Sequence, residues 1–148
     1  MTSDEVVRRA LQLLLAQDMA GFAGLWAEEG VLEFPFAAPG FPTRVQGRAA
    51  VAKYLSGYPD ILQIKDIPRQ RVHQSVDPDV VIVEFEITGT VTATGAPYRM
   101  TYIAVITTRN GEIQSYRDYW SPAAAADVMG GAQELLNAFR STKTTQPL

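Results

Sequence analysis

Cysteine is absent from this chain of 148 residues, and histidine occurs only once. Without cysteine there can be no disulfide framework, thiol nucleophile or thiolate metal site. A single histidine argues against a zinc or non-haem iron site, because such sites draw on several histidine or cysteine ligands. The glycines at 21, 24 and 30 do not follow a strand, so they are no dinucleotide fingerprint. We therefore expect chemistry that needs no metal, nucleotide or other cofactor.

Long apolar runs and an excess of positive charge are missing as well. No run approaches the roughly 20 apolar residues that a membrane-spanning helix needs. The segment from Met1 to Glu5 is acidic, unlike a secretion signal. The net charge is −3 and the 13 basic residues are scattered, which argues against a nucleic-acid partner. We expect a cytoplasmic protein that binds neither nucleic acid nor membrane.

The composition is that of one globular domain. Hydrophobic residues make up 47% of the chain and charged residues 20%, which is ordinary for a folded protein of this length. We expect a single domain over residues 1–139, followed by a disordered tail over 140–148.

Helical patterns dominate the first part of the chain. A capping box predicts a helix over residues 2–16, and a second, shorter helix is predicted over 18–30 with Trp26 on its apolar face. Residues 31–36 alternate like a strand. A third helix is predicted over 47–55.

The apolar period then changes to two. Strands are predicted over 61–75, 80–90, 98–109 and 112–120, and an Asn-Gly turn joins the last two as a hairpin. A final helix is predicted over 123–139. Helices followed by an antiparallel meander give an α+β fold, with the helices on one face of a curved sheet.

The segment Tyr116–Trp120 on the last predicted strand is the strongest functional signal. Alternation places Asp118 on the inward face with two aromatic side chains, while Arg117 and Tyr119 point to the other face. Burial disfavours the charged form of a carboxyl group, so the pKa of Asp118 is expected to rise toward neutrality. Asp118 is therefore a candidate general acid/base. It could also be a structural carboxylate that accepts a hydrogen bond from an arginine or the backbone.

Two further side chains are candidate catalytic groups. Tyr102 lies on the apolar face of its strand and could polarise a substrate carbonyl, with Tyr54 and Tyr98 as lesser candidates for the same role. His73 is the one side chain with an ordinary pKa near neutrality. The alternatives are an amphipathic core tyrosine and a surface or hydrogen-bonded structural histidine, which is favoured for His73.

A larger set of inward-facing side chains is expected to contact a ligand. Apart from a polar glutamine they are aromatic or soft, and most of them also serve as core. The predicted substrate-binding residues are Trp26, Phe34, Tyr54, Phe85, Met100, Gln114 and Trp120. Glu84 and Glu86 are expected to form a solvated or dimer-facing stripe, with Arg117 paired to one of them.

Several segments resemble the SnoaL-like family of the nuclear transport factor 2-like superfamily. They are residues 32–36, 47–51, 77–85, 110–113 and 116–122, and the resemblance spans about residues 4–125. It implies a cone-shaped α+β barrel in which a curved, mainly antiparallel sheet wraps around about three N-terminal helices. It also implies an apolar pocket and a homodimer formed through the outer sheet face.

The resemblance also suggests reaction types. Asp118 is similar in position to an acid/base aspartate of limonene epoxide hydrolase and of SnoaL-type polyketide cyclases. The arginine and second aspartate that the hydrolase also needs would fall at Phe85 and Ile87. The catalytic base of ketosteroid isomerase would fall at Phe34, and its oxyanion-stabilising tyrosine near Ala10. None of these four side chains can replace a charged or hydroxyl group. The cyclase assignment is therefore the least contradicted.

The resulting expectation is a cofactor-independent acid/base enzyme with an apolar, oxygenated substrate. A polyketide, terpenoid or steroid-like compound would suit it, and a cyclase or isomerase using Asp118 is the leading interpretation. An epoxide-opening hydrolase or cyclase and a non-catalytic small-molecule-binding protein remain as alternatives.

Overall fold

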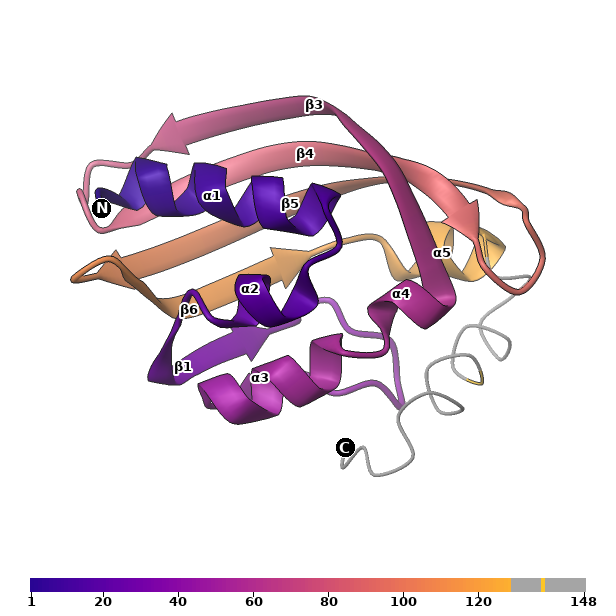
Figure 1. Ribbon diagram of the computed structural model, residues 1–148, viewed down its shortest axis with the longest axis horizontal. Helices are drawn as coiled ribbons and strands as arrows, with labels where there is room; N and C mark the ends of the chain where they lie inside the picture. The colour runs from indigo at the N-terminus through magenta and orange to yellow at the C-terminus, as the bar shows by residue number, and fades with distance from the viewer. Residues whose placement is uncertain (129–136, 138–148) are drawn as a thin grey trace.

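Six strands form one curved sheet, and the N-terminal helices lie against its concave side, as Figure 1 shows for a computed structural model of the protein. The structure describes residues 1–128 and 137. Its elements are α1 (Ser3–Leu15), α2 (Met19–Ala23), β1 (Trp26–Glu33), β2 (Arg44–Gln46), α3 (Arg48–Leu55), α4 (Tyr58–Ile61), β3 (Leu62–Gln74), β4 (Val80–Val91), β5 (Pro97–Arg109), β6 (Glu112–Tyr119) and α5 (Pro122–Val128).

The strand order in the sheet is β2-β1-β6-β5-β4-β3. All neighbouring strands are antiparallel except β1 and β6, which run parallel. The predicted α+β class and curved, mainly antiparallel sheet are confirmed. Helix α5 begins the helix predicted over 123–139, whose residues 129–136 and 138–139 lie outside the described residues, as does the tail predicted over 140–148.

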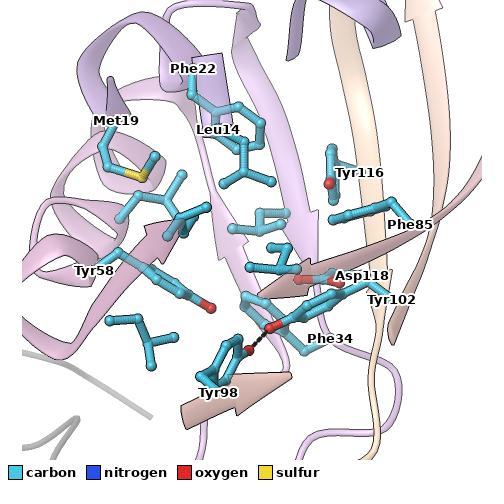
Figure 2. Close-up of a pocket in the computed structure, with 15 residues that line it drawn as sticks. Leu14, Met19, Phe22, Phe34, Tyr58, Phe85, Tyr98, Tyr102, Tyr116 and Asp118 are labelled. Carbon is cyan, nitrogen blue, oxygen red and sulfur yellow. Dashed lines mark hydrogen bonds between the residues drawn. The ribbon is translucent and has the colours of Figure 1, made fainter. Parts of the chain in front are cut away.

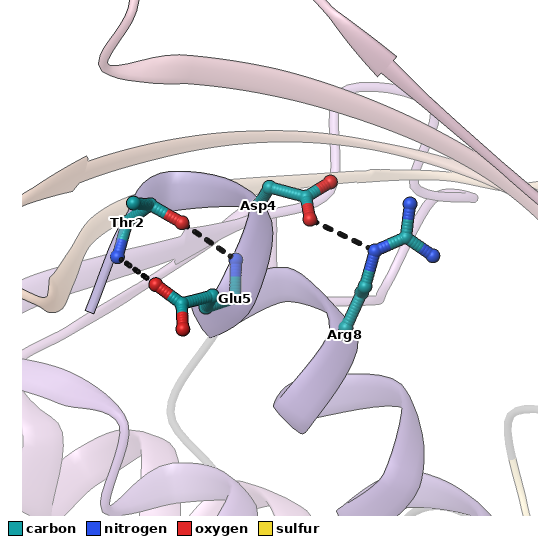
Figure 3. Close-up of polar contacts among 4 residues, drawn as sticks. All are labelled: Thr2, Asp4, Glu5 and Arg8. Carbon is teal, nitrogen blue, oxygen red and sulfur yellow. Dashed lines mark hydrogen bonds and ion pairs between the residues drawn. The ribbon is translucent and has the colours of Figure 1, made fainter.

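The first helix begins at the predicted capping box. Glu5 N donates to the Thr2 hydroxyl at 3.2 Å, and Thr2 N donates to the Glu5 carboxylate at 2.9 Å (Figure 3). The two bonds satisfy backbone donors that a helix N-terminus otherwise leaves open. An Asp4–Arg8 ion pair of 2.9 Å lies on the exposed side of the same helix. The apolar stripe of α1 can therefore pack on the sheet without loss of these bonds.

The second predicted helix was too long. Asp18 caps α2 as predicted, accepting from Gly21 N at 2.8 Å, but α2 ends at Ala23 and Trp26 begins β1. Gly30 lies inside that strand. A Cβ there would lie 2.6 Å from the carbonyl oxygen of Ile113, so glycine permits a close approach to β6 and does not end a helix.

The N-terminal end of β3 bends over the concave face. The β3–β4 pairing is irregular between Ile64 and Arg69. Close to this bend, a Cβ added at Gly89 would overlap the carbonyl oxygen of Gln63. Because Gly89 has no side chain, β3 can cross β4 closely, and Leu62 and Ile64 become part of a cavity wall.

A bulge in β6 sets which side chains face inward. Thr107 pairs with Ser115 but Thr108 pairs with Ile113, so Gln114 is an extra residue in the strand. The bulge lets both Ile113 and Tyr116 be buried although they are three residues apart. Gln114 therefore does not share the inward face with Asp118, which corrects the prediction made from strict alternation.

Within the described residues, no helix combines the length and the apolar character that crossing a membrane requires.

Candidate active site

A narrow apolar cavity lies between the concave face of the sheet and the helices (Figure 2). Of its 15 lining residues, seven are aromatic, seven are aliphatic or methionine, and one is a carboxylic acid. The empty space is about 590 Å³ with the mouth included, and the centre of a water molecule can occupy about 50 Å³ of it. The smaller volume describes the room left between the side chains, and it accommodates a small organic group.

The carboxylic acid is Asp118, on the inward face of β6. Its neighbour across the sheet is Ala104 on β5, a fully buried residue whose small side chain leaves room above the strand. Asp118 as a whole residue is half-buried, but its Oδ1 is closed to solvent and has no hydrogen-bond partner among the described residues. A buried acceptor without a donor is unusual in native proteins. The burial of this oxygen, more than the exposure of the rest of the residue, governs the chemistry of the carboxyl group.

Burial raises the pKa of Asp118 from its ordinary value of 3.8 to about 7. The physical cause is the loss of water around the carboxylate, with no cation nearby to offset it. Both protonation states are therefore populated near neutral pH. Asp118 can accept or release a proton there, as a general acid/base must.

Five tyrosines surround the carboxyl group. Burial is the main cause that raises the pKa of each of them, and the negative charge of Asp118 contributes in every case. They are Tyr54, Tyr58, Tyr98, Tyr102 and Tyr116. All five stay protonated over the physiological range, so they act as hydroxyl donors and not as bases.

Tyr98 and Tyr102 form a hydroxyl pair inside the cavity. Their OH groups are hydrogen-bonded to each other, and Figure 2 shows the hydroxyl of Tyr58 pointing toward them. The ring of Tyr102 stacks on Phe85, its cross-strand neighbour, with centroids 5.2 Å apart. This stacking fixes the ring of Tyr102 and so the direction of its hydroxyl.

Four of the predicted site residues line the cavity: Asp118, Tyr102, Phe34 and Phe85. A fifth, Tyr54, packs against Phe34 with ring centroids 5.5 Å apart and lies close enough to Asp118 to sense its charge. The structure thus brings together one predicted acid/base, one predicted hydroxyl donor and three aromatic side chains.

His73 lies elsewhere, on the opposite face of the sheet. Its Nε2 is 2.6 Å from the carboxylate of Glu84, and both side chains are exposed. The pairing of β3 with β4 places Val72 beside inward-facing Val83, so His73 points outward. The placement of His73 in the site was wrong, and the alternative of a hydrogen-bonded surface histidine is correct.

Three apolar residues predicted to bind substrate lie in the protein core or at its edge, away from the cavity lining. Trp26 is fully buried between Phe22 and Tyr116, because it begins β1 and does not lie on a helix face. Met100 is buried in the core without lining the cavity. Trp120 follows the end of β6 and packs on Phe41, with ring centroids 6.4 Å apart.

The charged stripe on the outer face also differs from its prediction. Glu84 is solvated, but Glu86 is only 8% exposed and accepts from Arg99 at 3.4 Å. Arg117 donates to the Tyr119 hydroxyl at 3.4 Å and not to a glutamate. Arg99 lies opposite Thr88, two pairs along the ladder from the Glu86–Thr101 pair and on the same face, so its side chain reaches Glu86.

Tyr58 is a hydroxyl-bearing lining residue that sequence reasoning missed. It lies in α4, in a Gly-Tyr-Pro segment that reads as a helix end. The signal available in the sequence was the tyrosine itself, an aromatic residue between Gly57 and Pro59 where the chain passes from a helix to the sheet. Within residues 1–128 and 137, no three histidine, aspartate or glutamate side chains come together as a potential metal site.

Comparison with known proteins identifies the family. The family described as "SnoaL-like domain" matches residues 7–116, about three-quarters of the chain. The uncharacterized protein YesE of Bacillus subtilis is 41% identical over 128 residues, which cover 86% of this chain and 87% of YesE. The PhzA/B-like protein PA3332 of Pseudomonas aeruginosa is 36% identical over 133 residues, covering 90% of this chain and 94% of that protein.

Solved structures agree with this assignment. A protein of Bacillus subtilis, provisionally described as an isomerase, superimposes with a TM-score of 0.82 at 39% identity over 88% of this chain and 97% of its own. A provisionally described polyketide cyclase of Pseudomonas putida gives a TM-score of 0.75 at 20% identity, over 86% of this chain and 98% of its own, and this likeness shows the fold alone.

Fold and cavity together define a small α+β cone with an apolar interior. The chain belongs to the SnoaL-like family. The family match ends two residues before Asp118, so the family assignment is independent of that residue.

Proposed function

We propose that this protein is a cofactor-independent acid/base enzyme, a cyclase or isomerase of an apolar, oxygenated small molecule. A polyketide, terpenoid or steroid-like compound fits the apolar lining. The observation that carries the proposal is the buried Asp118 carboxyl group, whose Oδ1 has no partner and whose pKa lies near 7. The name given to the similar structure from Bacillus subtilis, an isomerase, supports the same reaction class.

Proton transfer at carbon is the step that this geometry favours. Ionised Asp118 accepts a proton from a carbon next to a substrate carbonyl, and the electron pair of the broken C–H bond moves toward the carbonyl oxygen. The hydroxyl of Tyr102 donates a hydrogen bond to that oxygen as its negative charge grows. In an isomerisation, Asp118 then returns the proton to another carbon. In a cyclisation, the enolate carbon attacks a second carbonyl carbon, and protonated Asp118 gives its proton to the alkoxide oxygen that forms.

The apolar wall serves the same step. Aromatic and aliphatic side chains keep water from the reacting atoms, so a hydrogen bond from Tyr102 is worth more there than in solvent. A base whose pKa is near the working pH combines a large ionised fraction with adequate basicity. We expect the rate to rise with pH and to level off above the Asp118 pKa of about 7.

One observation favours a second candidate, a binding protein without turnover. Asp118 is the single carboxyl group among the lining residues, and Phe85 and Ile87 occupy the places of the additional charged groups. Epoxide opening by the three-residue site of limonene epoxide hydrolase has little support, because two of those three positions hold Phe85 and Ile87. Capture of a ligand, with Asp118 accepting a hydrogen bond from it, would need no further group.

Solvent deuterium exchange into β-tetralone, a flat bicyclic ketone with acidic C–H bonds, tests the proposal without the natural substrate. We expect faster exchange than in buffer by nuclear magnetic resonance, and a loss of roughly 10²–10⁴-fold in Asp118→Asn. Glu84→Gln makes the same carboxyl-to-amide change on the outer face and should exchange like the wild type.

Equal rates in the wild type and Asp118→Asn would refute the acid/base role. Ketone binding without exchange above the buffer rate would favour the binding protein instead.

We further propose that two copies pair through the outer sheet face. Ile103 on β5 is 41% exposed, and Phe36, which packs on Tyr119, is 62% exposed. Apolar side chains exposed together on a sheet face are typical of a protein interface.

A further inference from the structure

Among the described residues, the cavity lining contains one carboxyl group and no basic side chain. Its 15 lining residues include Asp118 but no lysine, arginine or histidine. A carboxylate or phosphate on a ligand would be buried beside Asp118 without a compensating cation. Such burial of uncompensated charge is costly, so anionic ligands are poorly suited to this cavity.

The same lining residues favour a positively charged ligand. Asp118 Oδ1 is a buried acceptor without a donor, and a ligand N–H or ammonium group would complete it. Seven aromatic rings line the cavity, and Figure 2 shows the labelled rings of Phe34 and Tyr102 next to Asp118. The faces of such rings attract organic cations, most strongly where water is excluded.

We propose that the cavity binds a small organic cation, a substrate whose protonated or quaternary amine lies against Asp118 and the surrounding rings. This inference rests on the proposed function in taking the cavity as the substrate site, and it adds the charge of the substrate. The narrow space suits an ammonium head group, with the apolar remainder of the molecule toward the mouth.

Binding of a permanent cation should follow the ionisation of Asp118 alone. The titratable groups that face this carboxyl are Tyr54 on α3, Tyr58 on α4, Tyr98 and Tyr102 on β5, and Tyr116 on β6. Helices α1 and α2 contribute only apolar side chains to the lining. None of the five tyrosines ionises below about pH 10, so any gain in affinity near neutral pH reports on Asp118.

Choline and its carbon isostere, in which carbon replaces the quaternary nitrogen, form a matched pair of probes for calorimetry. At about pH 8 we expect choline to bind at least about tenfold more tightly than the isostere. Toward about pH 6 the affinity for choline should weaken as Asp118 becomes protonated, while that for the isostere should stay constant. Asp118→Asn should abolish the preference and its pH dependence, and Glu84→Gln should retain both.

Three results would overturn the inference: no choline binding, equal binding of the two probes, or a choline affinity that does not change between these pH values. The pH series uses the wild type, so it decides the matter even if the Asn variant does not fold. The neutral ketone assay is separate. If the ketone exchanges but choline is not preferred, the inference of a cationic substrate fails and the acid/base role stands. If choline is preferred but the ketone does not exchange, the acid/base role fails and the protein binds a cation without turnover.

Discussion

The two faces of the sheet differ in whether their carboxyl groups have partners. On the outer face Glu84 pairs with His73 at 2.6 Å, and Glu86 pairs with Arg99 at 3.4 Å. On the inner face Asp118 has a buried Oδ1 without a partner. Each of these outer carboxylates therefore has a nitrogen partner, whereas the inner Oδ1 has none among the described residues.

This difference explains why sequence-adjacent residues can have unrelated roles. Arg117 and Asp118 follow one another on β6, yet one bonds the Tyr119 hydroxyl outside and the other faces the cavity. A partner on the outer face stabilises a charge locally and makes it structural. The inner Oδ1 lacks such a partner among the described residues, and burial raises the pKa of its carboxyl group to about 7.

The largest expected effect is on stability. Burial raises the pKa of Asp118 from 3.8 to about 7, so the folded protein binds the proton more tightly than the unfolded chain does. The contribution of Asp118 to the free energy of unfolding should therefore be highest below about pH 4, fall as the pH rises to about 7, and then level off, a loss of at most about 4 kcal/mol. Asp118→Asn should remove this fall and be more stable than the wild type at about pH 8.

Urea unfolding at several pH values measures this effect. Glu84→Gln on the outer face is the control and should keep the pH dependence of the wild type. An Asn variant that is less stable than the wild type at about pH 8 would mean that the inner carboxylate has a stabilising partner, and the contrast between the faces would fail.

A smaller effect, on the rate of ketone exchange, is expected when a hydroxyl is removed from the inner face but not from the outer face. Tyr102→Phe keeps the ring that stacks on Phe85 but removes the donor next to Asp118. The rate of ketone exchange should fall about 10²-fold, as for the loss of one donor to a developing oxyanion. Tyr119→Phe removes a hydroxyl from the outer face and should leave the rate unchanged. Equal losses in both variants would show that the hydroxyl of Tyr102 has no special role.

The smallest effect concerns the outer face alone. Ile103→Glu would place a charge at the centre of the proposed dimer interface, and burial of an unpaired charge there should raise the dimer dissociation constant by about tenfold or more. Sedimentation velocity measures the dissociation constant. Ketone exchange should be retained, because Ile103 points away from the cavity. A chain that is monomeric before the change would contradict the interface.

Sequence reasoning succeeded where the local pattern is unbroken. The capping box at Thr2 and Glu5 and the inward position of Asp118 follow from spacing alone, and both hold in the structure. The position of Asp118 was predictable because it lies beyond the β6 bulge, in a regular stretch that pairs with β5.

The failures lie at irregular backbone. The bulge at Gln114 breaks the alternation on which its predicted direction relied, and the irregular pairing near Pro68 hid the direction of His73. Gly30 reads as a helix end but permits a close strand contact, which misplaced Trp26. In each case a contact distant in sequence decides the local geometry, and a single sequence carries no direct signal of it.

The β6 bulge also has a consequence for the sign of charge inside the cone. Beyond Gln114, Tyr116 and Asp118 face inward and Arg117 outward. One residue inserted between Tyr116 and Arg117 would turn the side chain of Arg117 inward and that of Asp118 outward, because successive side chains of a strand point to opposite faces. A guanidinium would then stand where a carboxyl stands now, and a hollow suited to amines would become one suited to acids.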